Sequence, residues 1–226
     1  MDSRLHKLRQ VVRFLAHRAV VPSVAASVLA VALLVGRAYL TRTFGFGFLL
    51  WNLILAWVPY LGSLWAGRIH ERNPAKWWKL LLPGMLWLVF FPNAPYIVTD
   101  LWHLRERWPV PMWYDIGMLA TFALTGLFLA VFSLRIMQGL VRAYAGAAFG
   151  WFFALAVVCL GGLGVYLGRF LRWNSWDLVL HPQGVLGDVA ARLAHPLDHP
   201  QAMGVTVLFS AILFVSYLAV TTREPV

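Results

Sequence analysis

Long apolar stretches separated by short polar segments make up most of the chain. A helix that crosses the hydrocarbon core of a membrane needs about 20 mostly apolar residues. Six stretches meet that requirement: residues 22–40, 46–65, 78–101, 116–134, 145–167 and 203–220. The pattern therefore predicts an all-α fold, a polytopic membrane helix bundle of about six spans. Residues 22–220 are expected to form a single transmembrane domain, followed by a tail at 221–226.

The first 21 residues differ from the spans. Basic residues alternate there with leucine and valine in a pattern typical of an amphipathic helix, and they include Arg4, Lys7, Arg9, Arg13 and Arg18. A cleaved signal peptide has a shorter basic part and an apolar core of about 7–15 residues. We interpret residues 1–21 as a basic juxtamembrane segment that rests on anionic lipid.

The third span contains an interruption. Its apolar run meets the sequence PNAPYIVTD at Pro92–Asp100, where two prolines and an asparagine precede an acid. Asn93 is expected to cap a new helix through its side-chain oxygen, so the third span is predicted to break at Pro92 and Asn93. Such a break is tolerated in a membrane where the freed backbone is buried in protein or lines a wet cavity.

Composition and charge restrict the partners. Hydrophobic residues make up 61% of the 226 residues, and the formal net charge is +10. The basic residues lie in short segments beside the apolar stretches, which favours membrane lipids as partners and argues against nucleic acid. Lys and Arg number twelve on the side of the termini and seven on the other side. Both termini are therefore predicted to be cytoplasmic in a multi-pass protein of the inner cell membrane.

Three polar blocks are expected to meet on the side opposite the termini. In the first block, Tyr96, Asp100 and His103 share one helix face. The second block precedes the fourth span, and the third follows the fifth span. The predicted pocket consists of Asn93, Tyr96, Asp100, His103, Asp115, Arg169, Asn174 and Asp177.

Two chemistries are conceivable for these side chains, each with a simpler alternative. Asp100 and His103 suit a general base oriented by a carboxylate, or two ligands of a metal. The simpler interpretation is an interfacial helix end that meets water, and no metal site is assigned. Arg169 and Arg172 match the geometry of a phosphate, but arginines at the end of a span commonly reach lipid headgroups instead.

The loop before the sixth span is rich in histidine. His195 and His199 have the spacing of a helical metal pair, but Pro196 and Pro200 disfavour a helix there, so a solvated loop is the simpler interpretation. Apolar residues earlier in the loop recur at helical spacing. They predict a short helix on the outer membrane surface that could cover the pocket, and they are Val185, Leu186, Val189 and Leu193.

Small residues recur on the fourth and fifth spans, notably Gly117, Gly150, Gly164 and Gly168. Small side chains let helix backbones approach closely in membranes. We expect these positions to lie at helix contacts, and they identify no ligand.

Three blocks of the sequence resemble the recurring blocks of a known family. They are FFPNAPYIVTDLWHL at residues 90–104, WYD at 113–115 and YLGRFLRWNSWD at 166–177. The resemblance spans about Leu33–Tyr217 and is to an uncharacterised bacterial membrane-protein family, domain of unknown function 1361. It implies a multi-spanning bacterial membrane protein, and it implies no activity, substrate or catalytic residue.

Three functions are compatible with these residues. The preferred one is a protein that binds a polar or lipid-linked ligand, or an anionic small molecule, in an outward-facing pocket. An alternative is a membrane-embedded hydrolase or transferase acting on a lipid-linked substrate, with Asp100 or His103 as base and Arg169 as anion clamp. The third is a structural or assembly protein without a ligand. The sequence identifies no cofactor.

Overall fold

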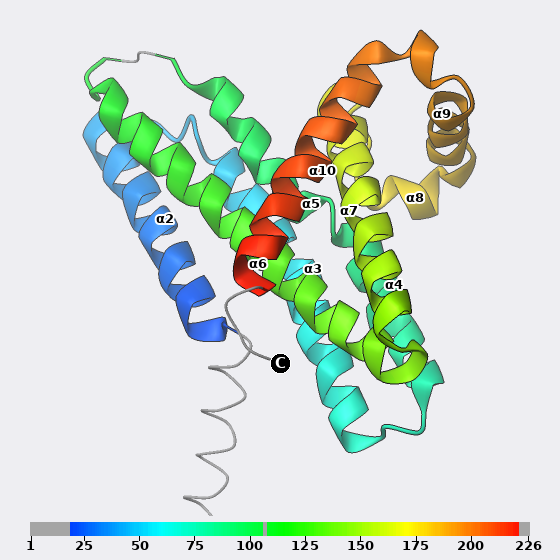
Figure 1. The fold of residues 1–226 in the computed structure, drawn as a ribbon. Coiled ribbons are helices and arrows are strands. Elements are labelled where there is room, and N and C mark those ends of the chain that lie inside the picture. Colours follow the sequence, from blue (N-terminus) through cyan, green and yellow to red (C-terminus); the bar gives the residue numbers. More distant parts are fainter. Residues whose placement is uncertain (1–18, 106–107, 222–226) are drawn as a thin grey trace, which may run out of the picture.

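The computed structural model describes residues 19–105 and 108–221, and this part of the chain is helical, without β-strands. Most of the predicted basic segment and the tail from residue 222 lie outside the described residues. The elements shown in Figure 1 are α2 (Val20–Thr41), α3 (Phe48–Arg72), η1 (Trp77–Leu80), α4 (Leu81–Phe90), α5 (Asn93–Tyr96), η2 (Ile97–His103), α6 (Met112–Ala145), α7 (Ala147–Phe170), α8 (Asp177–Leu180), α9 (Pro182–Ala194), η3 (Pro196–Asp198) and α10 (Pro200–Thr221).

Six helical segments are long and apolar enough to cross a membrane: α2, α3, the composite segment Trp77–His103, α6, α7 and α10. This finding confirms the predicted all-α bundle of about six spans. Two helices run well past their predicted ends at residues 65 and 134, because α3 continues to Arg72 and α6 to Ala145. The added turns carry polar and basic residues, which a helix can present to water beyond the hydrocarbon.

The longest helix, α6, organises the bundle. Its 34 residues span about 50 Å at about 1.5 Å per residue, more than the hydrocarbon thickness of about 30 Å. It runs diagonally through the molecule, with α2 on one side and α7 and α10 on the other (Figure 1). It contacts α2, α3, α7, α10 and both short helices of the broken span.

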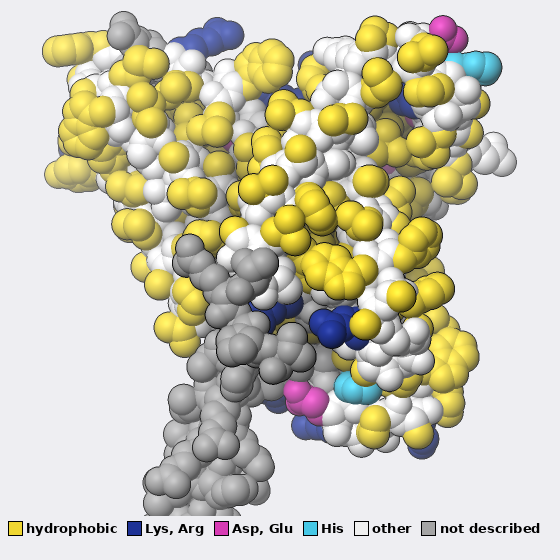
Figure 2. Space-filling model, in the orientation of Figure 1, with side chains coloured by type: hydrophobic (Ala, Val, Ile, Leu, Met, Phe, Trp, Pro, Cys, Tyr) yellow, Lys and Arg dark blue, Asp and Glu magenta, His cyan; other side chains and the backbone are white. Residues whose placement is uncertain are grey.

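Apolar side chains cover the outside of the spans. Figure 2 shows hydrophobic groups over most of the visible face, with charged groups near its upper corners and in its lower half. Exposed tryptophans lie near both ends of the spans: Trp65, Trp77 and Trp78 at one end, and Trp102, Trp108 and Trp113 at the other. Lipid satisfies such an apolar surface, and tryptophan prefers the two membrane interfaces. The protein is therefore a multi-pass integral membrane protein.

The third span breaks where the prolines predict it. Helix α4 ends at Phe90, α5 begins at Asn93, and the chain continues as the tighter helix η2. The predicted cap is wrong, because Pro92 occupies the N-cap position and Asn93 is already the first residue of α5. The N–H of Ala94 donates to the carbonyl oxygen of Phe91, which leaves the Phe90 carbonyl without that backbone partner. The side-chain amide of Asn93 donates to this Phe90 carbonyl over 3.0 Å.

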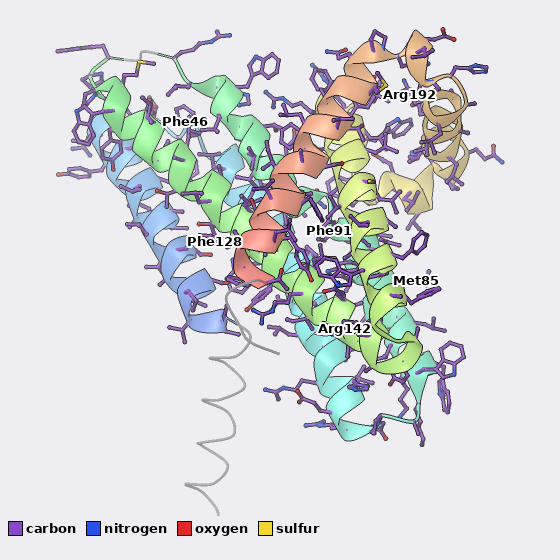
Figure 3. The ribbon with its side chains drawn as sticks, in the orientation of Figure 1. Phe46, Met85, Phe91, Phe128, Arg142 and Arg192 are labelled. Carbon is purple, nitrogen blue, oxygen red and sulfur yellow. The ribbon has the colours of Figure 1, made fainter. Side chains whose placement is uncertain are left out.

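Glycines on α6 and α7 make room for the break. A methyl group at Gly126 would overlap the carbonyl oxygen of Ala94, and one at Gly164 would lie 2.5 Å from Cγ of Pro92. Gly161 faces the ring of Phe91, which Figure 3 shows at the centre of the bundle. In contrast, a methyl group at Gly117 would meet no atom within 4 Å. The irregular backbone is thus buried between two helices rather than facing lipid.

The glycine contacts predict unequal effects of two substitutions on α6. Gly126→Ala forces a methyl group onto the backbone of α5, so we expect it to lower the free energy of unfolding by about 1–3 kcal/mol. Gly117→Ala meets no neighbouring atom and only replaces glycine by a better helix former. The free energy of unfolding of this variant should therefore be unchanged or higher by up to about 1 kcal/mol. Thermal unfolding of both variants in one detergent measures the difference. Equal midpoints would contradict this close approach of α6 to α5.

Candidate functional site

A pocket of about 390 Å³ lies beside the break. Helices α3, α4, α5 and α7 form its sides, and the segment from Trp173 to Val189 closes it. Its lining residues are Trp51, Asn52, Leu55, Leu88, Val89, Pro92, Asn93, Tyr96, Leu160, Leu163, Gly164, Leu167, Gly168, Trp173, Asn174, Ser175, Leu178, Val185, Leu186 and Val189. The pocket therefore occupies the half of the bundle beside which α8 and α9 lie (Figure 1).

Four lining residues have amide or hydroxyl side chains, and we call them the polar wall: Asn52, Asn93, Asn174 and Ser175. The Asn93 amide donates to Ser175 Oγ over 2.7 Å, which ties the broken span to the loop after α7. Asn174 donates its backbone N–H (2.7 Å) and its side-chain amide (3.2 Å) to one oxygen of Asp177. The backbone N–H of Asn174 lowers the pKa of Asp177. Two predicted site residues, Asn93 and Asn174, thus line the pocket.

Aliphatic side chains of α4 and α7 also line the pocket, and we call them the apolar wall: Leu88, Val89, Leu160, Leu163 and Leu167. Leu88 and Leu160 are 43% and 49% exposed. Both lie on helical segments that are long and apolar enough to cross a membrane.

Helix α9, in the segment between α7 and α10, covers part of the pocket. It contains the predicted stripe, and its Val185 and Val189 line the pocket. Asp188 fastens the helix to α7's end, since it accepts from Trp173 Nε1 over 2.7 Å and from Arg192 over 2.8 Å. These hydrogen bonds hold the pKa of Asp188 below its ordinary value, so this carboxylate is charged at neutral pH.

Arg192, the partner of Asp188, also contacts α7. The guanidinium of Arg192 lies 5.8 Å from the ring centroid of Tyr166. Figure 3 labels Arg192 beside α9 at the upper right of the bundle. Trp173, Asp188, Arg192 and Tyr166 together hold α9 in place.

Asp100 lies behind the polar wall and is only 1% exposed. It accepts a 2.8 Å hydrogen bond from the Asn52 amide, so it connects to the pocket through Asn52. His103 places Nδ1 3.3 Å from the backbone oxygen of Asp100, and its ring centroid lies 4.8 Å from that of Phe48. The η2 segment is thus a tight helix whose polar groups turn toward α3.

Two other predicted residues lie on α5 and α7. Tyr96 lines the pocket, and its ring lies against Gly168. The guanidinium of Arg169 lies 5.9 Å from the ring centroid of Trp102. Arg169 is not among the residues that line the pocket.

Asp115 lies away from the pocket, on the α2 side of α6. Both of its oxygens accept from Arg37, over 2.6 Å and 3.0 Å, and the two side chains are 1% and 4% exposed. The guanidinium also lies 4.3 Å from the ring centroid of Phe46. A charge inside a membrane protein is costly unless an opposite charge pairs with it, and this pairing places Asp115 outside the pocket.

The sequence interpretation did not identify Asn52 or Arg37 as important. Asn52 had a detectable signal, since it is an amide within an otherwise apolar span. Arg37 lies close to the end of the apolar stretch at residues 22–40, where an arginine is expected to face the loop side. Among the described residues, no group of three or more His, Cys, Asp and Glu side chains could hold a metal ion.

The buried ion pair predicts a double-variant result. Asp115→Asn leaves the Arg37 guanidinium buried beside a neutral group, so we expect a loss of about 3–5 kcal/mol in the free energy of unfolding. The combination of Arg37→Met with Asp115→Leu removes both charges and should recover most of that loss. Thermal unfolding of the two forms provides the comparison. A single variant as stable as the wild type would show that the pair does not hold α2 to α6.

Comparison with known proteins identifies the family. The chain matches the family described as "Protein of unknown function (DUF1361)" over residues 51–216, which is more than half of its length. Comparisons with curated proteins and with solved structures gave no match. The matched region runs from α3 into α10 and contains every residue that lines the pocket. The chain is therefore an integral membrane protein of the DUF1361 family.

Proposed function

We propose that this protein binds an amphipathic ligand, either a lipid or a lipid-linked molecule, in the pocket beside the broken span. The observation that carries the proposal is the pairing of two unlike walls in one cavity. The polar wall presents amide and hydroxyl groups, and the apolar wall consists of aliphatic side chains on membrane-spanning helices, of which Leu88 and Leu160 are partly exposed. A ligand with a polar head and a hydrocarbon tail matches both walls at once.

The energetics of the membrane support this proposal. Polar side chains within a span are costly, and they commonly mark a binding site or a pathway. Here Asn52 and Asn93 of two spans line one cavity together with Asn174 and Ser175 of the loop after α7. The volume of about 390 Å³ also lies within the range of about 300–1,000 Å³ that small-molecule sites occupy.

Binding accounts for the geometry better than catalysis. The alternative of a hydrolase or transferase requires Asp100 or His103 to act on a bound substrate, with Arg169 as anion clamp. Asn52 lies between Asp100 and the pocket and occupies one of its carboxylate oxygens. Catalysis would therefore need a rearrangement of Asn52, whereas binding needs none.

A native mass spectrum of the purified protein tests the proposal. Leu160→Trp places a large ring in the apolar wall, and Leu155→Trp places the same ring on α7 at a similarly exposed position, 46% against 49%, outside the pocket. We expect co-purified lipid in the wild type and in Leu155→Trp, and its loss in Leu160→Trp. A wild type without bound lipid, or equal retention in both variants, would favour a structural role instead.

We also propose that the pocket faces the outside of the inner cell membrane, with both termini in the cytoplasm. The support is the excess of Lys and Arg in the loops on the side of the termini. Leu197, 82% exposed, and Lys76, also exposed, lie at opposite ends of the spans.

Single cysteines at these two positions, in a Cys159→Ala background, report the orientation. A membrane-impermeant maleimide applied to intact spheroplasts should label Leu197→Cys and should reach Lys76→Cys only after lysis. The reverse pattern would place the pocket on the cytoplasmic side.

A further inference from the structure

We infer that the headgroup recognised in the pocket is an uncharged, hydroxyl-rich group such as a sugar, carried on a hydrocarbon chain. This inference rests on the proposed function and names the class of its ligand. The lining residues of the pocket contain no Asp, Glu, Lys, Arg or His. A pocket that selects a charged headgroup would need an opposite charge within reach, because an unpaired charge loses its hydration on burial.

The orientations of the asparagines decide what the polar wall can bind. The Asn93 amide nitrogen donates to Phe90 O and Ser175 Oγ, which uses both of its hydrogens. The Asn52 and Asn174 amide nitrogens each donate to a carboxylate, of Asp100 and Asp177 respectively. Carbonyl and carboxylate oxygens only accept, so these amide groups cannot be reversed without losing their partners.

The amide oxygens are consequently the groups left for a ligand. The structure gives the side-chain oxygens of Asn52, Asn93 and Asn174 no donor among the described residues. Ser175 Oγ accepts from Asn93 and retains its own hydrogen to donate. The polar wall is therefore rich in acceptors and also contains a donor, which is the complement of several hydroxyl groups.

Anionic headgroups do not match this arrangement. Phosphate and carboxylate oxygens accept hydrogen bonds, so the three amide oxygens would face them unpaired, and Ser175 would be a donor of the polar wall. Asp100 and Asp177 lie directly behind Asn52 and Asn174 and add negative charge on that side. Arg169, the guanidinium predicted to clamp an anion, does not line the pocket and lies 5.9 Å from the ring centroid of Trp102.

Cationic headgroups are also disfavoured. The carboxylates of Asp100 and Asp177 already accept hydrogen bonds from Asn52 and Asn174, and they do not line the pocket. An ammonium group would therefore reach amide oxygens but no ionised partner. The remaining polar class, neutral hydroxyl groups on a ring, also suits the aromatic lining of Trp51, Tyr96 and Trp173, whose faces can pack against the C–H groups of a sugar.

Four octyl amphiphiles with different headgroups test the inference. Octyl β-D-glucoside, octyl phosphate, octylamine and 1-octanol, each below any micelle-forming concentration, are titrated against the protein in nanodiscs, with bound ligand read by native mass spectrometry. We expect the glucoside to bind at least about 10-fold more tightly than each of the others. A tenfold difference in affinity corresponds to about one additional hydrogen bond between neutral groups.

Three variants sharpen the result. Asn174→Ala removes an amide oxygen while leaving the backbone N–H of residue 174 on Asp177, and it should weaken glucoside binding roughly 2- to 10-fold and leave octanol binding unchanged. Asn93→Ala should weaken the glucoside similarly, and Asn174→Ala remains informative if Asn93→Ala does not fold. Leu160→Trp should abolish binding of every amphiphile.

The outcomes separate the two proposals. If octyl phosphate or octylamine binds as tightly as the glucoside, the neutral headgroup is overturned and the amphipathic site stands. If glucoside and octanol bind equally, recognition by the polar wall is overturned. If no amphiphile binds the wild type better than it binds Leu160→Trp, both the site and its headgroup are overturned.

Discussion

Backbone polar groups released at a break in a membrane-spanning helix need partners, because lipid offers none. In this protein the break at Phe91–Pro92 releases the Phe90 carbonyl, and the Asn93 amide donates to it. The surrounding helices exclude lipid by approaching closely at glycines, with Gly126 against Ala94 and Gly164 against Pro92. The rest of the site depends on the Asn93–Phe90 hydrogen bond and on these glycine contacts. Together they hold Asn93 beside α7 and keep the interrupted backbone inside the bundle.

The pocket is a consequence of the same break. A continuous third span would keep one helical period along its whole length. The η2 segment is wound more tightly, and in it Asp100 faces Asn52 on α3. Asn93 then reaches Ser175, which positions the loop that leads into α8 and α9. Helix α9 is held over the cavity by Asp188, through Trp173 and Arg192. Local backbone chemistry thus leads stepwise to a cavity with one polar and one apolar wall.

The sequence predicts well the features that depend on a long apolar stretch or on residues close together in the chain. Six apolar stretches predict six spans, and the prolines of PNAPYIVTD predict the break at Pro92. The stripe from Val185 to Leu193 predicts the helix that becomes α9. Each of these follows from length, periodicity or proline geometry, which need no knowledge of the neighbouring helices.

The pairings between helices could not be predicted from one sequence. Arg37 resembles an arginine that reaches toward headgroups at the end of a span, and only the packing of α2 on α6 shows that it pairs with Asp115. Gly117 and Gly126 look alike in sequence, but the rotation of α6 turns one to open space and the other to α5. Asn52 and Asp100 are 48 residues apart and meet through the position of α3. The roles of Asn93, Tyr96 and Asn174 in binding stay predictions.

The central claim is that a two-walled pocket beside the broken span holds an amphipathic molecule. The most direct measurement is an experimental structure of the wild-type protein in lipid nanodiscs, with a bound antibody fragment to allow alignment of a small particle. We expect elongated density that begins at Asn93, Asn174 and Ser175 and leaves the pocket between Leu88 and Leu160. A pocket filled by its own side chains, or one that contains only water, would contradict it.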